Sequence, residues 1–199
     1  MTATAAATAF ALAVPPSWYE VDLHPQTRNG SVAALVRERV AVVPELEPHR
    51  ASLVHALRSA SRTAHSHGAV YCGVLAEGFD TALLTATITV SVVAAPGEVA
   101  AVGKHLRPIP SRGPDRPWRV VEEVGLPHIG TVTRTRGVED VPLPDGAGWV
   151  RTALLQTFVP WPGAGQTRVA LITGGSPALP LAAEMHDLFD AITTTFRFT

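Results

Sequence analysis

The last fifty residues constrain the fold most, because strand and helix patterns follow one another there in a fixed order. Residues 149–159 and 167–173 predict two strands joined by a tight turn at residues 160–163. Ser176 and Pro177 have the residue types of an N-cap and a first helical position. The helix expected after them has the apolar stripe Leu181, Met185, Leu188, Phe189 and Ile192, and residues 193–198 predict a closing strand.

A second hairpin is predicted by residues 69–76 and 81–93, which are separated by residues of turn type. Successive side chains of a strand point to opposite faces. In the second of these strands one face is therefore apolar, and we expect it to be core. The other face is lined by hydroxyls, from Thr85, Thr87, Thr89 and Ser91.

Two consecutive helices are predicted before this hairpin, over residues 31–43 and from Glu45 to Gly68, with Pro44 between them. Both have an apolar stripe, so we expect them to pack together against one face of the sheet. Residues 118–125 and 129–137 predict another hairpin. The fold class expected is α+β: an antiparallel sheet flanked by α-helices, an α/β/α sandwich forming a single domain over residues 1–199 with residues 1–9 frayed.

Composition excludes several functional classes. A net charge of −1 over 199 residues argues against nucleic acid as a partner, because phosphate neutralisation needs clustered Lys and Arg. No window approaches 18 consecutive apolar residues, so no membrane span is expected. One cysteine, Cys72, excludes an intrachain disulfide. We expect a soluble, cytoplasmic protein. Alanine is abundant and nearly every basic residue is arginine, which predicts a GC-rich, actinobacterial genome.

The strand-turn-helix-strand ending over residues 171–198 resembles the ending of PsbP-like domains, a group of α/β sandwiches that includes the Ran-binding Mog-type proteins. The segment Val14-Pro15-Pro16-Ser17-Trp18 resembles the opening of the same group. The resemblance implies an antiparallel sheet flanked by helices and accessory or partner-binding roles, mostly without catalysis. It carries over no functional residue.

No residue pattern predicts catalysis, a metal or a cofactor. His65 and His67 lie two positions apart on a predicted helix and point about 200° apart, which does not suit shared metal ligation. Cys72 shares a predicted strand face with valines and is expected to be an inert core thiol. His186, Asp187 and Asp190 are expected on the solvated side of the last helix.

Two segments are candidates for binding another protein. Trp161 stands between two prolines at a predicted hairpin tip, where it either anchors an interface or folds back over the sheet edge. Arg112 and Arg116 lie in a Pro/Arg-rich loop that either binds an acidic partner or is solvated.

The first functional hypothesis is therefore a non-catalytic accessory or protein-interaction module. The alternative is a small-ligand-binding protein or enzyme with a pocket between the threonine-lined sheet face and a helix. Homo-oligomerisation is a third possibility, and it overlaps with the first.

Overall fold

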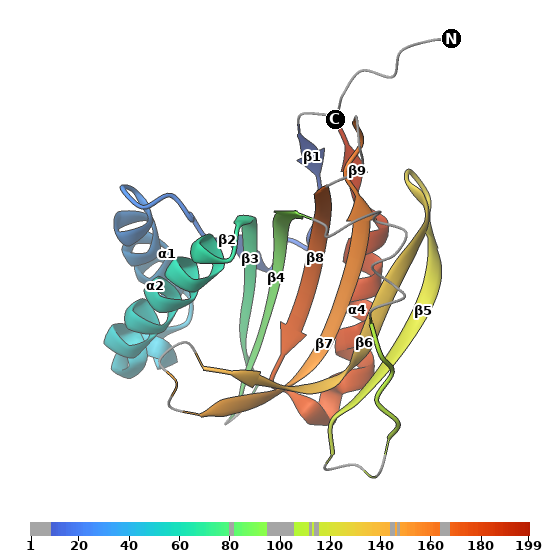
Figure 1. Cartoon of the computed structure of the whole chain (residues 1–199). Helices are drawn as coiled ribbons and strands as arrows, with labels where there is room; N and C mark the ends of the chain where they lie inside the picture. The colour runs from blue at the N-terminus through green and yellow to red at the C-terminus, as the bar shows by residue number, and fades with distance from the viewer. Residues whose placement is uncertain are drawn as a thin grey trace.

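A seven-stranded sheet forms the centre of the molecule (Figure 1). The computed structural model describes residues 9–79, 82–94, 106–111, 113, 116–143, 146, 148–163 and 168–199. All strand pairs in this sheet are antiparallel and helices flank it, which confirms the predicted fold class. The strand order is β2-β3-β4-β8-β7-β6-β5. The strands are β1 (Phe10–Ala11), β2 (Trp18–Glu20), β3 (Ala69–Phe79), β4 (Ala82–Ala94), β5 (Trp118–Leu126), β6 (Gly130–Pro142), β7 (Trp149–Pro160), β8 (Arg168–Ser176) and β9 (Arg197–Phe198).

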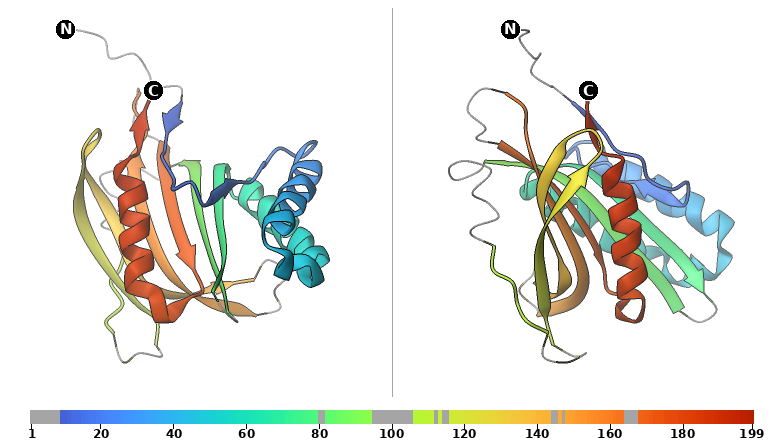
Figure 2. Two further views of the ribbon diagram at one scale, coloured as in Figure 1. Left: turned by 180° about the vertical axis from the view of Figure 1, so that it is seen from behind. Right: turned by 90° about the vertical axis from the view of Figure 1, so that its right-hand side faces the viewer.

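The face of the sheet that carries the apolar residues of β4 is covered by α4 (Ala182–Thr194). Ile88 and Val90 of β4 are fully buried there with Phe189 of α4, as the alternation in the sequence predicts. The last strand, β9, pairs with β1 at the end of the sheet, where Phe196 stacks on Phe10. Figure 2 shows α4 lying along this face, while the other two helices lie at the β2–β3 edge of the sheet.

The two predicted N-terminal helices are α1 (Arg28–Val42) and α2 (Arg50–Ser66), joined by the 3₁₀ turn η1 (Pro44–His49). Gly68 follows α2 with φ of +77°, a backbone conformation that suits glycine after a helix end. The pair packs on the β3 edge of the sheet through a second apolar cluster, to which Val32, Val36 and Cys72 belong. Cys72 is buried, and burial raises the pKa of its thiol to about 11.

The predicted N-cap at Ser176 is wrong. Ser176 is the last residue of β8 and is fully buried, and its Oγ donates a hydrogen bond to the carbonyl oxygen of Thr85 at 2.7 Å. The chain continues through the 3₁₀ turn η3 (Leu179–Leu181), and α4 begins only at Ala182. Ser176 therefore ties β8 to β4 instead of starting the helix.

The predicted solvated position of His186 is also wrong. Its ring is buried between α4 and the sheet, with Nε2 3.0 Å from the carbonyl oxygen of Gly137. The ring lies edge-on to that of Trp118, with ring centroids 5.9 Å apart. Asp187 is exposed, as predicted. Asp190 is half-exposed, and it pairs with the buried guanidinium of Arg134, which also donates from Nε to Thr157 at 3.1 Å.

We expect His186 to make folding stability depend on pH. Burial lowers the pKa of His186 in the folded state, so the unfolded chain binds more protons below its ordinary pKa of about 6.5. The contribution of His186 to folding stability is therefore complete above that pH and is lost as the pH falls. Urea unfolding of wild type should show stability rising from pH 5 to pH 7. His186→Gln, which can still donate to Gly137, should rise less; an equal rise in both proteins would contradict this role.

Candidate functional site

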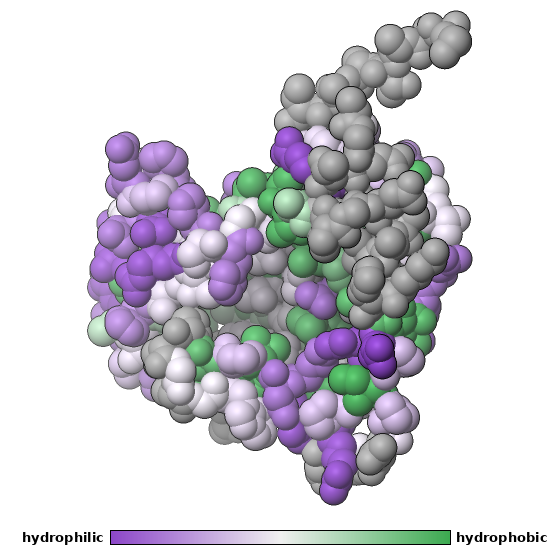
Figure 3. All heavy atoms as spheres, in the orientation of Figure 1, coloured by the Kyte–Doolittle hydropathy of each residue, from purple (hydrophilic) through white to green (hydrophobic). Residues whose placement is uncertain are grey.

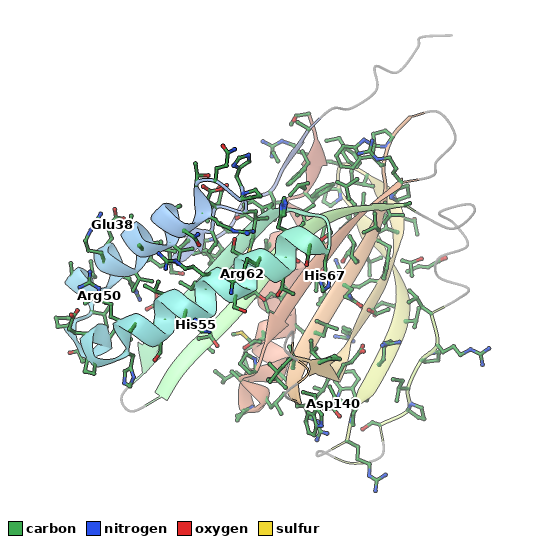
Figure 4. The ribbon with its side chains drawn as sticks, turned by 60° about the vertical axis from the view of Figure 1, so that its left-hand side comes forward. Glu38, Arg50, His55, Arg62, His67 and Asp140 are labelled. Atoms are coloured by element: carbon green, nitrogen blue, oxygen red, sulfur yellow. The ribbon has the colours of Figure 1, made fainter. Side chains whose placement is uncertain are left out.

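A cleft of about 480 Å³ lies between the helix pair and the sheet face opposite α4. Strands β3, β4, β8 and β7 form its floor, and α1 and α2 form one wall. The β6 and β7 ends that meet around residues 141–150 curve under the helix pair and close the lower side (Figure 1). The space-filling view shows a hollow between these parts (Figure 3). In Figure 4, α2 crosses in front of β3 and β4, and Asp140 marks the β6 side of the rim.

The floor of the cleft carries part of the predicted hydroxyl-lined face, whereas Thr89 and Ser91 of that face do not line it. Thr85 and Thr87 of β4 line it, and Thr87 is exposed although β4 is a central strand. Gly175 stands directly opposite Thr87 in β8, and its lack of a side chain leaves room above the sheet. The helices therefore cover the edge of this face and leave its middle open.

Two floor hydroxyls already donate to the backbone. Thr87 Oγ1 donates to the carbonyl oxygen of Gly175 at 3.5 Å, and Thr152 Oγ1 of β7 donates to that of Val150 at 3.2 Å. A hydroxyl that donates one hydrogen bond still has lone pairs with which to accept another. These threonines can therefore accept hydrogen bonds from a molecule in the cleft.

The helical wall is apolar and partly built from small residues. Leu53 and Leu57 of α2 line the cleft together with Ala56 and Ala60, which are exposed. Residues four apart lie on the same side of a helix, so the two small alanine side chains lie together and leave space between the leucines. Leu35 of α1 completes this side. A larger side chain at either alanine would occupy the cleft.

The lower rim is apolar and exposed. Val141 at the end of β6 and Val150 at the start of β7 face each other as paired residues, and both line the cleft. Trp149 stands next to them with 57% of its surface exposed, and the guanidinium of Arg151 lies 5.0 Å from its ring centroid. Apolar surface thus continues from the cleft onto the adjoining ends of β6 and β7.

Arg39 is the one charged side chain among the described lining residues. It reaches from the last turn of α1 to β2 and β3, and only 14% of its side chain is exposed. Nη1 donates to the hydroxyl of Tyr19 at 2.9 Å. Nη2 donates to the carbonyl oxygen of Ala76 at 2.8 Å and to Oε2 of Glu77 at 3.0 Å. Its positive charge is thus matched by a carboxylate in direct contact.

The chemistry of this lining is that of a binding site. No His, Cys, Asp or Glu is found among its described residues. Within the described ranges, no group of three such side chains is placed to hold a metal ion either. What the cleft offers is apolar surface to bury a ligand and hydroxyl groups to orient it.

The predicted partner-binding residues lie elsewhere. Trp161 is half-buried: its ring packs edge-on against Phe198 at 5.1 Å, and the guanidinium of Arg168 lies 5.2 Å from its centroid. These contacts match the alternative in which Trp161 folds back over the sheet. Arg116 is exposed, and Arg112 lies outside the described residues. Because β5 and β7 run in the same direction, Arg116 before β5 and Trp161 after β7 lie at opposite ends of the sheet.

Sequence reasoning identified two of the cleft threonines, Thr85 and Thr87, and missed the rest of the lining. It did not identify Arg39, which is one of the cleft residues. The signal that was available is the pair Ala56 and Ala60, which share one side of α2 with the leucines. Nothing local indicates that the ends of β6 and β7 reach under the helices.

Comparisons with protein-family models, with curated proteins and with solved structures gave no match. The resemblance to PsbP-like domains therefore stays a prediction. Among the described helices, none combines the length and the apolar character that a membrane crossing requires.

Proposed function

We propose that this protein binds a small, mainly apolar molecule in the cleft between the helix pair and the threonine-lined sheet face. The observation that supports it most is the open floor: Thr87 is exposed in the middle of a seven-stranded sheet, beneath a helix pair that does not close over it. A protein ordinarily buries both faces of a central strand where helices cover it. An open face with apolar walls is the shape of a ligand site.

The size of the cleft fits this function. Small-molecule sites are concave, mostly apolar and about 300–1,000 Å³ in volume, with a few polar groups that fix orientation. The volume here is about 480 Å³. Its walls are aliphatic, and the polar groups at its floor are threonine hydroxyls.

A neutral fluorescent probe tests the proposal. N-phenyl-1-naphthylamine should bind wild type saturably with increased fluorescence. Thr87→Phe fills the floor and should weaken binding by about tenfold or more, because it removes space that the ligand needs. Thr131→Phe is the matched control, since Thr131 is an exposed strand threonine of β6 outside the cleft. Equal binding by both variants would contradict the assignment, as would no binding by wild type.

A second function, a non-catalytic protein-interaction module, is favoured by the exposed residues at the ends of β6 and β7. Among the residues that the structure describes, Trp149 is the most exposed aromatic side chain, and Val141, Leu143 and Val150 are exposed beside it. Exposed aromatic residues with apolar neighbours are frequent anchors of protein interfaces. The proposal moves the anchor from Trp161 to Trp149, because Trp161 already packs on Phe198.

The two tryptophans should respond differently to substitution. Trp149→Ser should leave the melting temperature nearly unchanged and reduce recovery of a protein partner in affinity capture. Trp161→Ser should cost about 1–2 kcal/mol of stability, or roughly 2–8 °C in melting temperature, because half-buried aromatic contacts are lost. A large fall in melting temperature for Trp149→Ser would make it a structural residue. Recovery that is insensitive to Trp149→Ser would remove it as the anchor.

A further inference from the structure

We infer that the ligand of the cleft is uncharged: an aliphatic molecule carrying a hydroxyl or similar neutral polar group, and not a carboxylate or a phosphate. The inference rests on the proposed binding function and goes further by naming the ligand class. It follows from how the one charged lining residue is paired and from which polar groups remain.

The pairing of Arg39 removes the cation that an anionic ligand would need. A buried carboxylate is stable only when it is paired and hydrogen-bonded. Arg39 is the cation among the described lining residues, but both of its terminal nitrogens are used within the protein and Glu77 neutralises its charge at 3.0 Å. An acid entering the cleft would have to displace Glu77 or remain unpaired.

The floor carries the hydroxyls of Thr85, Thr87, Thr152 and Thr173, on three neighbouring strands, and two of these hydroxyls favour a neutral ligand. Thr87 and Thr152 use their protons on backbone carbonyl oxygens, so toward the cleft they act as acceptors. An acceptor requires a donor on the ligand, which an alcohol supplies and an ionised carboxylate does not.

A matched pair of competitors tests this. Octan-1-ol and octanoate have the same chain length, and at pH 8 octanoate is ionised. Each is titrated against N-phenyl-1-naphthylamine bound to wild type. Octan-1-ol should displace the probe at a concentration about tenfold or more below that of octanoate, because the unpaired anion loses its hydration.

The outcomes separate the two proposals. Displacement by octanoate at an equal or lower concentration would overturn the inference on charge while leaving ligand binding in place. Displacement by neither compound from a probe that does bind would also overturn it. No binding of the probe at all would remove the proposed function itself.

Glu77→Gln should reduce or abolish the preference for the neutral competitor. The substitution keeps the shape of the side chain and leaves the charge of Arg39 unpaired at the cleft, so the affinity for octanoate should rise about tenfold through a charge-assisted hydrogen bond. Glu38→Gln is the control, since it makes the same change in charge one residue from Arg39. Glu38 is exposed on the outer side of α1, away from the strands (Figure 4). An equal rise in both variants would mean that net charge alone causes the effect.

Discussion

Replacing Gly174 with alanine is expected to destabilise the protein by about 3 kcal/mol or more, and to lower its melting temperature by roughly 6–12 °C. A Cβ at this position would lie 2.4 Å from Cγ of Phe189. Phe189 is fully buried and packs edge-on against Trp18, with ring centroids 6.5 Å apart, so its ring has no free space into which it can turn. The added methyl would force α4 away from β8. Urea and thermal unfolding measure the effect.

The neighbouring glycine is the control. A Cβ at Gly175 would lie on the cleft side, 3.3 Å from the methyl group of Thr152, which can shift by a few tenths of an ångström. Gly175→Ala should therefore change stability by less than about 1 kcal/mol. The double variant Gly174→Ala with Phe189→Leu should be less destabilised than the sum of its single changes, because the smaller side chain relieves the clash. Strict additivity would argue against this mechanism.

Replacing Gly137 with alanine should have an effect of similar size, for a different reason. A Cβ there would lie 2.0 Å from the carbonyl oxygen of Trp118 and 2.9 Å from Cα of Arg119. Backbone atoms cannot rotate out of the way, so β5 would have to separate from β6. We expect a loss of about 3 kcal/mol or more and faster amide hydrogen exchange across β5.

Gly125→Ala is the matched control for this change. It lies in β5 and pairs with Thr131 of β6, and a Cβ there would meet nothing within 4 Å. Its stability should be close to that of wild type, with slow exchange retained in β5. If Gly137→Ala were as stable as Gly125→Ala, the close approach of β5 to β6 would not constrain position 137.

The local part of the fold was predictable because its signals are local. The hairpins β3–β4, β5–β6 and β7–β8 follow from alternation and turn composition, and the threonine face of β4 follows from the period of two. The pairing of β4 with β8 did not follow. It joins Thr87 to Gly175, 88 residues apart, and nothing in either strand specifies the other.

The two wrong predictions on the C-terminal segment have a common cause. Ser176 has the right type for a helix cap, but a hydrogen bond to Thr85 from a distant strand holds it in the sheet. His186 is polar, but it adjoins Met185 on the buried side of α4 and finds a backbone acceptor at Gly137. In both cases a tertiary partner satisfies a group that sequence alone assigns to a cap or to water.

The cleft depended on the same long-range arrangement. The hydroxyl face was foreseen, but a cleft exists only because α1 and α2 sit over the edge of the sheet and the β6–β7 ends curve beneath them. The pairing of Arg39 requires Tyr19 of β2 and both Ala76 and Glu77 of β3 to lie within hydrogen-bond distance of its guanidinium. The spacing of residues in the sequence does not indicate such long-range contacts.

Side chains alternate between the two faces of each central strand, so that of two neighbouring residues one belongs to the core and the other to the cleft. On β4, Ala86 and Ile88 serve folding while Thr87 between them faces the cleft, and on β8 the adjacent Gly174 and Gly175 are divided in the same way. Substitutions on one side of the sheet can therefore accumulate without disturbing packing on the other. The lining of the cleft is therefore free to change over evolution while the scaffold is kept, and a protein engineer has the same freedom.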